Sequence, residues 1–248
     1  MTQKIKVGAV SYLNTKPLIY GFEQGEMKEE IDLIMDYPAR IAALLIEGSI
    51  DIGLVPVAII PLLKEHHIVS DYGIACDGEV ASVCLFSDVP LEQIETVLLD
   101  YQSRTSVALL KILLAEHWKI SPLLIAGNAR YENDIEGSTA GLVIGDRALA
   151  QRKKSKFIYD LGTAWKAMTG LPFVFAAWVS NKKIPAGFIA DFNKANELGL
   201  QSLDKIIRQQ HNQVYDLQRY YTKDIRYTID KHKQEGMQLF LQKIAGGR

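Results

Sequence analysis

The chain has 248 residues, enough for one large domain or two small ones, and it contains 48% hydrophobic and 23% charged residues, as soluble globular proteins usually do. Its formal net charge of −1 excludes an overall field that would attract nucleic acid or an anionic membrane. No apolar run is long enough to cross a bilayer, and no apolar core of a signal peptide precedes the first strand. We therefore expect a cytoplasmic protein that binds neither nucleic acid nor membrane.

Strands and helices alternate in the first third of the chain. A helix is predicted from Ala39 to Glu47, where Gly48 stops it, and a second short helix runs to Lys64. The resulting βαβαβ order predicts a parallel sheet with helices on its faces. Apolar runs bounded by turn residues predict the strands Ile5–Val10, Ile31–Met35, Asp51–Val55, His67–Cys76 and Val80–Phe86.

The same alternation continues through the rest of the chain. The run Phe173–Val179 is apolar at every position, which is typical of a strand buried on both faces. The other predicted strands are Thr96–Leu99, Leu123–Ala126, Leu142–Asp146 and Phe157–Tyr159. The predicted helices are Val107–Trp118, Arg147–Gln151, Ala164–Met168, Pro185–Gln209 and Tyr227–Ile244.

This order predicts two α/β lobes, with the second inserted in the first. The first lobe comprises residues 1–87 and 173–248, and the second comprises residues 88–172. The chain is expected to cross outward along Val83–Ser87 and to return along Phe173–Val179. Neither crossing has a flexible Gly/Ser linker, so we expect the two strands to act as a paired hinge, with a ligand in the cleft between the lobes.

The sequence predicts an anion-binding site where the first strand ends. Ile5–Val10 runs into Ser11–Leu18, in which Asn14 or Thr15 can cap a helix and Pro17 suits its first turn. Hydroxyl and amide side chains at a helix N-terminus, next to the carboxyl end of a strand, suit a carboxylate or phosphate. The alternative is an ordinary helix cap that binds nothing.

Three motifs carry a specific resemblance that covers the whole chain. They are Ser11–Leu18 (SYLNTKPL), Gly48–Pro56 (GSIDIGLVP) and Trp165–Trp178, which contains TGLPFVFA. The second is shared with many solute-binding proteins, whereas the first and third are distinctive. The chain resembles the chorismate dehydratase family of the futalosine route to menaquinone, which implies an α/β, two-lobed fold of the type II periplasmic-binding-protein kind. One departure is Val57-Ala58, where related sequences often carry polar residues, so a ligand contact there must use backbone N–H groups.

The resemblance implies a lyase that removes water from chorismate to give 3-[(1-carboxyvinyl)oxy]benzoate. This elimination makes the ring aromatic and moves no hydride, so no cofactor is expected, and the task is to position a dianion and stabilise charge. The sequence has no metal-ligand spacing, dinucleotide fingerprint or P-loop. The proton acceptor stays open, with the enolpyruvyl carboxylate of the substrate as one candidate and no Asp, Glu or His standing out as another.

Carried onto this sequence, the family pattern implies two catalytic side chains. Asn14 would orient the substrate and polarise the leaving hydroxyl, where its alternative role is a helix cap. Ser82 lies just before the outgoing strand, and the pattern favours a hydroxyl that points into the cleft over one that serves a turn.

Six further residues are expected to bind the substrate. At the helix that begins the second lobe, the hydroxyl and backbone N–H groups of Ser103, Thr105 and Ser106 would form a second carboxylate-binding site. The alternative is a helix start at which these residues only act as caps. After a later strand, Gly145 lets the backbone approach the ligand closely, and the carboxylate of Asp146 is expected to cap the next helix. These residues are Ser11, Ser103, Thr105, Ser106, Gly145 and Asp146.

Other chemistry-bearing residues receive structural interpretations. Arg40 and Arg147 are either counter-ions for an anion or solvated surface residues. Cys76 and Cys84 have no metal-ligand spacing and are expected to be buried, reduced thiols, and no metal site is predicted. Trp178 is expected to pack in the core rather than contact a ligand.

Two other functions stay open on the sequence alone. The commonest task of this fold is reversible ligand capture, so a non-catalytic protein that binds a small anion is one alternative. The related enzyme of the same pathway that forms dihydroxynaphthoate is the other, although the opening Ser11–Leu18 fits the dehydratase better. The lack of a DNA-binding domain argues against a transcription regulator, and the lack of a leader argues against an exported receptor.

Overall fold

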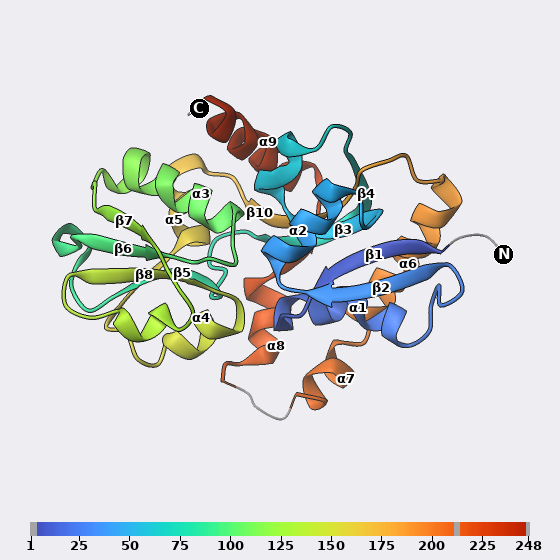
Figure 1. Ribbon diagram of the computed structural model, residues 1–248. Helices are drawn as coiled ribbons and strands as arrows, with labels where there is room; N and C mark the ends of the chain where they lie inside the picture. Colours follow the sequence, from blue (N-terminus) through green and yellow to red (C-terminus); the bar gives the residue numbers. More distant parts are fainter. Residues whose placement is uncertain (1–3, 211–213, 247–248) are drawn as a thin grey trace.

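The computed structural model describes residues 4–210 and 214–246, which form two α/β units side by side (Figure 1). The first unit is built on a six-stranded sheet in the order β11-β4-β10-β3-β1-β2. Its strands are β1 (Ile5–Val10), β2 (Ile31–Asp36), β3 (Ile52–Pro56), β4 (His67–Cys76), β10 (Phe173–Ser180) and β11 (Arg226–Thr228). The second unit has a five-stranded sheet in the order β7-β6-β8-β5-β9. Its strands are β5 (Val83–Ser87), β6 (Thr96–Leu99), β7 (Leu123–Ala126), β8 (Thr139–Ile144) and β9 (Phe157–Asp160).

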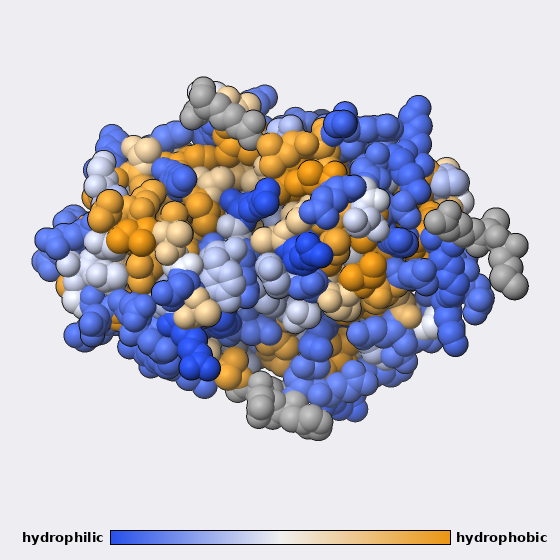
Figure 2. Space-filling view, viewed as in Figure 1, coloured by the Kyte–Doolittle hydropathy of each residue, from blue (hydrophilic) through white to orange (hydrophobic). Residues whose placement is uncertain are grey.

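Helices cover both sheets and leave a core of apolar side chains beneath them. They are α1 (Lys16–Glu23), α2 (Pro38–Glu47), α3 (Thr105–Ile112), α4 (Gly145–Gln151), α5 (Leu161–Thr169), α6 (Ala186–Leu200), α7 (Leu203–Arg208), α8 (Leu217–Arg219) and α9 (Lys231–Gly246). Within the described ranges, no helix is long and apolar enough to traverse a bilayer. Hydrophilic residues dominate the rim of the molecule in the space-filling view (Figure 2), and apolar residues show in several areas of the face turned to the viewer. Exposed apolar side chains include Leu123 and Ile125 on the edge strand β7.

The first sheet is mixed, whereas the strand order predicted a parallel sheet. Strand β1 pairs in parallel with β2 and β3, but β10 pairs antiparallel with both β3 and β4. The reason is that β10 arrives from the second unit. It therefore starts next to the carboxyl ends of its neighbours and runs in the opposite direction, with Phe173 paired to Cys76 and Ala176 to Pro56.

The outward crossing differs from the prediction. Val83–Ser87 was expected to run between the lobes, but as β5 it pairs with β8 and β9 inside the second sheet. The chain therefore crosses at residues 77–82 and returns at residues 170–172, since all of β10 lies in the first sheet. We accordingly propose that one boundary between the lobes lies between residues 172 and 173, as expected. The other lies within residues 77–82 rather than between residues 87 and 88.

Two predicted C-terminal helices have different bounds. The helix expected over residues 185–209 breaks at Gln201–Ser202 into α6 and α7. The helix expected from Tyr227 begins only at Lys231, because Arg226–Thr228 pairs with β4 and completes one edge of the first sheet. A π-helical turn, Tyr220–Asp224, precedes this strand and lies close to the crossing segment.

The motif Trp165–Trp178 forms the return crossing and its packing. Trp165 is fully buried, and its ring N–H donates to the carbonyl of Pro172 at 3.2 Å. Trp178 is buried against α6, where its ring N–H donates to Asn196 Oδ1 at 2.9 Å. Its core role is as expected, so this motif mainly fixes the position of β10 against the helices.

The helix that follows the N-terminal motif is held by a close approach between α1 and α6. Gly21 on α1 lies against the Ala195 carbonyl, and Gly199 on α6 lies against the Pro17 carbonyl, so an added Cβ at either position would overlap a backbone oxygen. These contacts hold the N-terminal end of α1, and with it the preceding turn that carries Asn14, beyond the carboxyl end of β1.

We predict that Gly21→Ala and Gly199→Ala each lower the free energy of unfolding by roughly 1–3 kcal/mol, because the helices must separate to admit a methyl group. Gly187→Ala in the first turn of α6 is the matched control, since its Cβ would meet nothing within 4 Å. It should be neutral or stabilising by up to about 1 kcal/mol. Urea unfolding of the three variants measures the difference, and equal stabilities would contradict the proposed close packing.

Candidate functional site

A cavity lies between the two units, at the carboxyl ends of β1, β3 and β4 and beside the start of β10. It has about 530 Å³ of space between atoms, a figure that includes open solvent at its mouth. Both units contribute to its wall. The lining residues are apolar except for a few hydroxyl, amide and backbone groups: Val10, Tyr12, Asn14, Pro38, Leu54, Pro56, Ile74, Val80, Ser82, Val83, Ser103, Thr105, Ser106, Ile144, Gly145, Phe175 and Ala176.

Asn14 lies in a 3₁₀ turn, Leu13–Thr15, between β1 and α1, and lines the cavity. The cap residue of α1 is Thr15, and neither it nor Asn14 caps the helix through a side chain. Asn14 Oδ1 accepts a hydrogen bond from the Thr15 hydroxyl at 3.2 Å, and its backbone carbonyl accepts one from the Tyr227 hydroxyl at 3.0 Å. Within the described ranges its Nδ2 has no protein acceptor, so the amide donors are available to a ligand.

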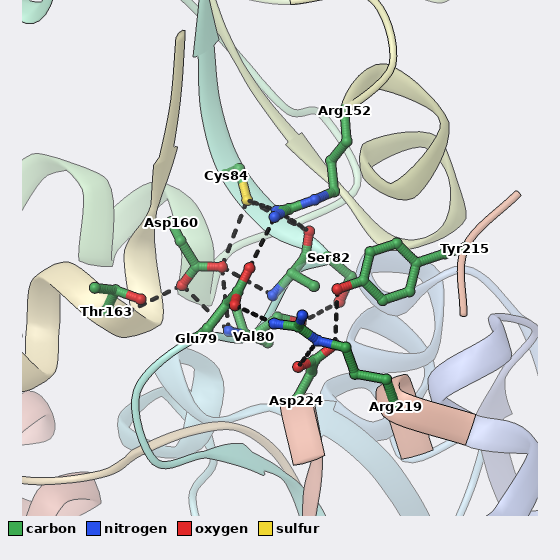
Figure 3. A network of polar contacts seen from close by, with 11 residues as sticks. Glu79, Val80, Ser82, Cys84, Arg152, Asp160, Thr163, Tyr215, Arg219 and Asp224 are labelled. Atoms are coloured by element: carbon green, nitrogen blue, oxygen red, sulfur yellow. Dashed lines mark hydrogen bonds and ion pairs between the residues drawn. The ribbon is translucent and has the colours of Figure 1, made fainter. Parts of the chain in front are cut away.

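Ser82 is presented to the cavity by a tight turn. Its N–H donates to the Val80 carbonyl at 2.7 Å, which closes a three-residue turn around Ala81, whose φ is +61°. A left-handed backbone is unfavourable for a residue with a Cβ, so surrounding contacts must hold the turn. Asp160 accepts hydrogen bonds from the N–H groups of Val80 at 3.1 Å and Ala81 at 2.8 Å, and Arg152 donates to the Ala81 carbonyl at 3.1 Å (Figure 3).

Asp160 also caps α5 by accepting from the Thr163 N–H at 3.0 Å. Burial raises the pKa of Asp160 above its ordinary value, while the N–H donors of Thr163, Ala81 and Val80 act in the opposite direction. Sequence reasoning missed this residue, although Asp before an apolar helix start is a recognisable cap signal. Its second role is to accept hydrogen bonds from the turn at Val80 and Ala81, about 80 residues earlier in the chain, and no local sequence pattern indicates this contact.

An ion-pair network surrounds the outward crossing. Glu79 accepts from Arg152, just after α4, at 2.7 Å and from Arg219 of α8 at 2.6 Å (Figure 3). Arg219 also pairs with the buried Asp224 at 3.2 Å. Asp224 in turn accepts from Tyr215, where burial and this hydrogen bond raise the pKa of the Tyr215 phenol to about 12. The network links the second unit to the C-terminal segment across the crossing.

The residues of the second predicted carboxylate-binding site, Ser103, Thr105 and Ser106 at the start of α3, all line the cavity. Ser103 Oγ accepts from the Ser106 N–H at 3.1 Å, which is a capping role. Thr105 Oγ1 accepts from the Ala58 N–H of the first unit at 3.1 Å, so this hydroxyl joins the two units. That contact also occupies one of the two backbone N–H groups of Val57-Ala58 that were expected to be available to a ligand.

Gly145 lines the cavity, but two other predicted binding residues do not. Ser11 is exposed, and its N–H donates to the Asp36 carbonyl at 3.2 Å. Asp146 accepts from the Leu13 N–H at 3.0 Å and thereby ties α4 to the turn that carries Asn14. Burial raises the pKa of Asp146, and the Leu13 N–H opposes that rise.

Neither candidate counter-ion faces the cavity. Arg147 pairs with both oxygens of Asp100, at 2.8 and 2.9 Å, and with Glu132 at 2.8 Å. Burial alone would lower the pKa of Arg147, but the Asp100 carboxylate raises it. Arg40 is exposed on α2.

No metal site is evident in the parts of the chain that the structure describes, where no group of three or more His, Cys, Asp or Glu residues converges. Cys76 and Cys84 are buried and are not joined by a disulfide, as expected. Burial raises the pKa of both thiols well above the ordinary value. The hydrogen-bond donors among the residues that line the cavity are neutral hydroxyl, amide and backbone groups.

Tyr12 is a cavity residue that sequence reasoning did not single out. Its ring comes from the first unit and packs on Gly145 of the second, where a Cβ added to Gly145 would lie 3.0 Å from two ring carbons. Its hydroxyl donates to Gln102 Oε1 in the second unit. Burial, and next the Asp100 carboxylate, raise the pKa of Tyr12 well above the ordinary phenol value.

Two lobes around one cavity, with the chain crossing twice between them, define the periplasmic-binding-protein-like class of folds. The structure is similar over 99% of its length to protein AF1704 from Archaeoglobus fulgidus (98% of that chain, 14% identity, TM-score 0.72). It is also similar over 96% to the CA3427 gene product of Candida albicans, described as having the generic periplasmic binding protein fold (90% of that chain, 13% identity, TM-score 0.60). The predicted fold class is confirmed.

Sequence comparison places the chain more narrowly. Residues 5–246 match the family model described as menaquinone biosynthesis, and the chain belongs to that family. It is 27% identical over 269 aligned positions to a chorismate dehydratase of Thermus thermophilus, covering 96% of this chain and 94% of the relative. The family relationship expected from the three motifs is confirmed.

We predict that Gly145→Ala weakens the contact between the two units, because φ at this position is +64° and the new Cβ would press on the Tyr12 ring. Gly137→Ala is the matched control in the same unit, with φ +55° and open space around its Cβ. The backbone cost of about 1–2 kcal/mol applies to both variants. Chemical unfolding should show a larger loss for Gly145→Ala, and an equal loss would argue against a specific contact with Tyr12.

Proposed function

We propose that this chain is a chorismate dehydratase, which eliminates water from chorismate to give 3-[(1-carboxyvinyl)oxy]benzoate in menaquinone biosynthesis by the futalosine route. The observation that carries the proposal is the cavity that brings Asn14, Ser82 and the start of α3 together from three distant parts of the chain. The relative from Thermus thermophilus, which bears the name of this activity, supports it. We infer a cytoplasmic enzyme that acts on a small molecule and needs neither metal nor organic cofactor.

The lining of the cavity suits a flat, dianionic ring. Phe175, Leu54 and Ile74 supply apolar walls for the ring. The hydroxyl of Ser106 at the start of α3 is assigned to one carboxylate, since a helix N-terminus favours negative charge, while the Ser106 N–H is already bonded to Ser103 Oγ. The second carboxylate needs donors from the opposite unit, where Asn14 lies.

Loss of the hydroxyl and a neighbouring ring hydrogen aromatises the ring, so the protein has to stabilise developing charge and position the reacting groups. In this proposal Asn14 Nδ2 and the Ser82 hydroxyl donate to substrate oxygens on which charge grows. None of the cavity-lining residues is Asp, Glu or His. We therefore assign the proton to the enolpyruvyl carboxylate of the substrate itself.

A direct product assay tests the proposal. Purified protein is incubated with chorismate, and the aromatic product is followed by absorbance and identified by mass spectrometry. Formation of the enolpyruvyl benzoate with activity retained in chelator supports the dehydratase. Binding of chorismate without product would favour the non-catalytic binding protein. Neither binding nor product would direct attention to the related dihydroxynaphthoate-forming enzyme, and activity that requires an added divalent ion would contradict the metal-free account.

We predict that Asn14→Ala and Ser82→Ala each lower kcat by roughly 10²–10³, the usual loss for one preorganised donor. Ser82→Ala also leaves a buried tyrosine hydroxyl without its acceptor, so its free energy of unfolding should fall by about 1–3 kcal/mol. Asn14→Ala should be close to wild type in stability, because Asn14 does not cap α1.

Ser87→Ala is the matched control for these variants. Ser87, in β5, is fully buried like Ser82, but its hydroxyl donates to the Val89 carbonyl at 2.8 Å and it does not line the cavity. It should lose stability and keep its turnover. Steady-state kinetics and thermal midpoints separate the two roles, and near-normal turnover with a lower midpoint for Asn14→Ala or Ser82→Ala would remove that residue from the site.

A further inference from the structure

A buried tyrosine lies directly behind Ser82. Tyr220, in the π-helical turn Tyr220–Asp224, has no solvent-exposed surface and does not line the cavity. Its hydroxyl is 2.8 Å from Ser82 Oγ, although the two residues are 138 positions apart in the chain. Ser82 is also fully buried, so both hydroxyls need partners within the protein or in the cavity.

The available acceptors decide the direction of this hydrogen bond. Apart from Ser82, the Tyr220 hydroxyl has no acceptor within hydrogen-bond distance in the residues that the structure describes. Tyr220 therefore donates and Ser82 Oγ accepts. The proton of Ser82 then has only the Val80 carbonyl, at 3.5 Å, which is at the limit of a hydrogen bond.

We propose that Tyr220 is a positioning residue for the elimination: by donating to Ser82 Oγ it fixes that oxygen and leaves the Ser82 proton directed to the substrate. This inference rests on the proposed function. A hydroxyl that accepts one hydrogen bond becomes a stronger donor in the next, so the Tyr220–Ser82 chain strengthens the donor that faces the cavity. The turn at Ala81 fixes the backbone of Ser82, and Tyr220 fixes its side chain.

Tyr220 keeps its proton, as this role requires. Burial raises its pKa well above the ordinary phenol value, and the hydrogen bond to Ser82 only partly opposes that rise. Nearby carboxylates, with Asp146 the strongest and then Asp224, add to the rise, as does Tyr221. The Tyr220 hydroxyl therefore stays protonated at neutral pH.

The test is a double-mutant cycle with Tyr220→Phe and Ser82→Ala. Tyr220→Phe should lower kcat about five- to tenfold with KM within twofold of wild type, the loss expected for one hydrogen bond. In the Ser82→Ala background the same substitution should cause no further loss of kcat, since the hydroxyl that it orients is gone. It should also raise the thermal midpoint of Ser82→Ala, because it removes the tyrosine hydroxyl left without an acceptor.

Tyr221→Phe is the matched control. Tyr221 is the next residue, is equally buried, and its hydroxyl has no partner among the described residues. This variant should keep kcat and be at least as stable as wild type.

The outcomes separate this inference from the proposed function. An active wild-type enzyme with normal kcat in Tyr220→Phe, or an equal loss in both Ser82 backgrounds, would overturn the role of Tyr220 and leave the dehydratase intact. A wild-type protein that does not dehydrate chorismate would overturn both. If Tyr220→Phe has a lowered midpoint, single-turnover rates below that midpoint and the Ser82→Ala background still decide the assignment.

Discussion

The carboxylate of Asp160 is the interaction on which the rest of the site depends. It holds the N–H groups of Val80 and Ala81 and at the same time caps α5. Together with the hydrogen bond from Arg152 to the Ala81 carbonyl, it offsets the cost of a left-handed Ala81, which is of order 1–2 kcal/mol. Because that turn ends at Ser82, a buried carboxyl group in the second unit decides where the hydroxyl enters the cavity. Asp160 thus supports a site whose described lining residues are themselves uncharged.

The neutrality of the cavity wall has a consequence for the proposed chemistry. An arginine facing a dianion would stabilise the bound substrate and the transition state alike, which does not accelerate the chemical step. Hydroxyl, amide and N–H donors fixed in direction act most strongly on charge that develops during the reaction. The cationic groups nearby are already paired, Arg147 with Asp100 and Arg152 with Glu79. They stabilise the scaffold rather than the ligand.

The two units meet through directional contacts as well as apolar ones. The Leu13 N–H to Asp146 and Ala58 N–H to Thr105 hydrogen bonds each join a site element of one unit to the other. Glu79, in the outward crossing, accepts from Arg152 and Arg219 on either side of it. These contacts join the two units around the cavity.

The sequence by itself determined most strands, the inserted second unit and the family, and it pointed to six of the residues that line the cavity. Local patterns suffice for these, since apolar runs mark strands such as Ile5–Val10 and short polar motifs place Asn14 and Ser82 at strand ends. Only the tertiary structure decided that β10 runs antiparallel to its neighbours and that β5 belongs to the second sheet. It also decided which of the predicted site residues line the cavity and which join the two units. Asp146 and Thr105 became links between units, and Tyr220 came to lie behind Ser82, because those contacts join residues 47 to 138 positions apart. No local pattern encodes such pairings, since they depend on how the two sheets pack around the cavity.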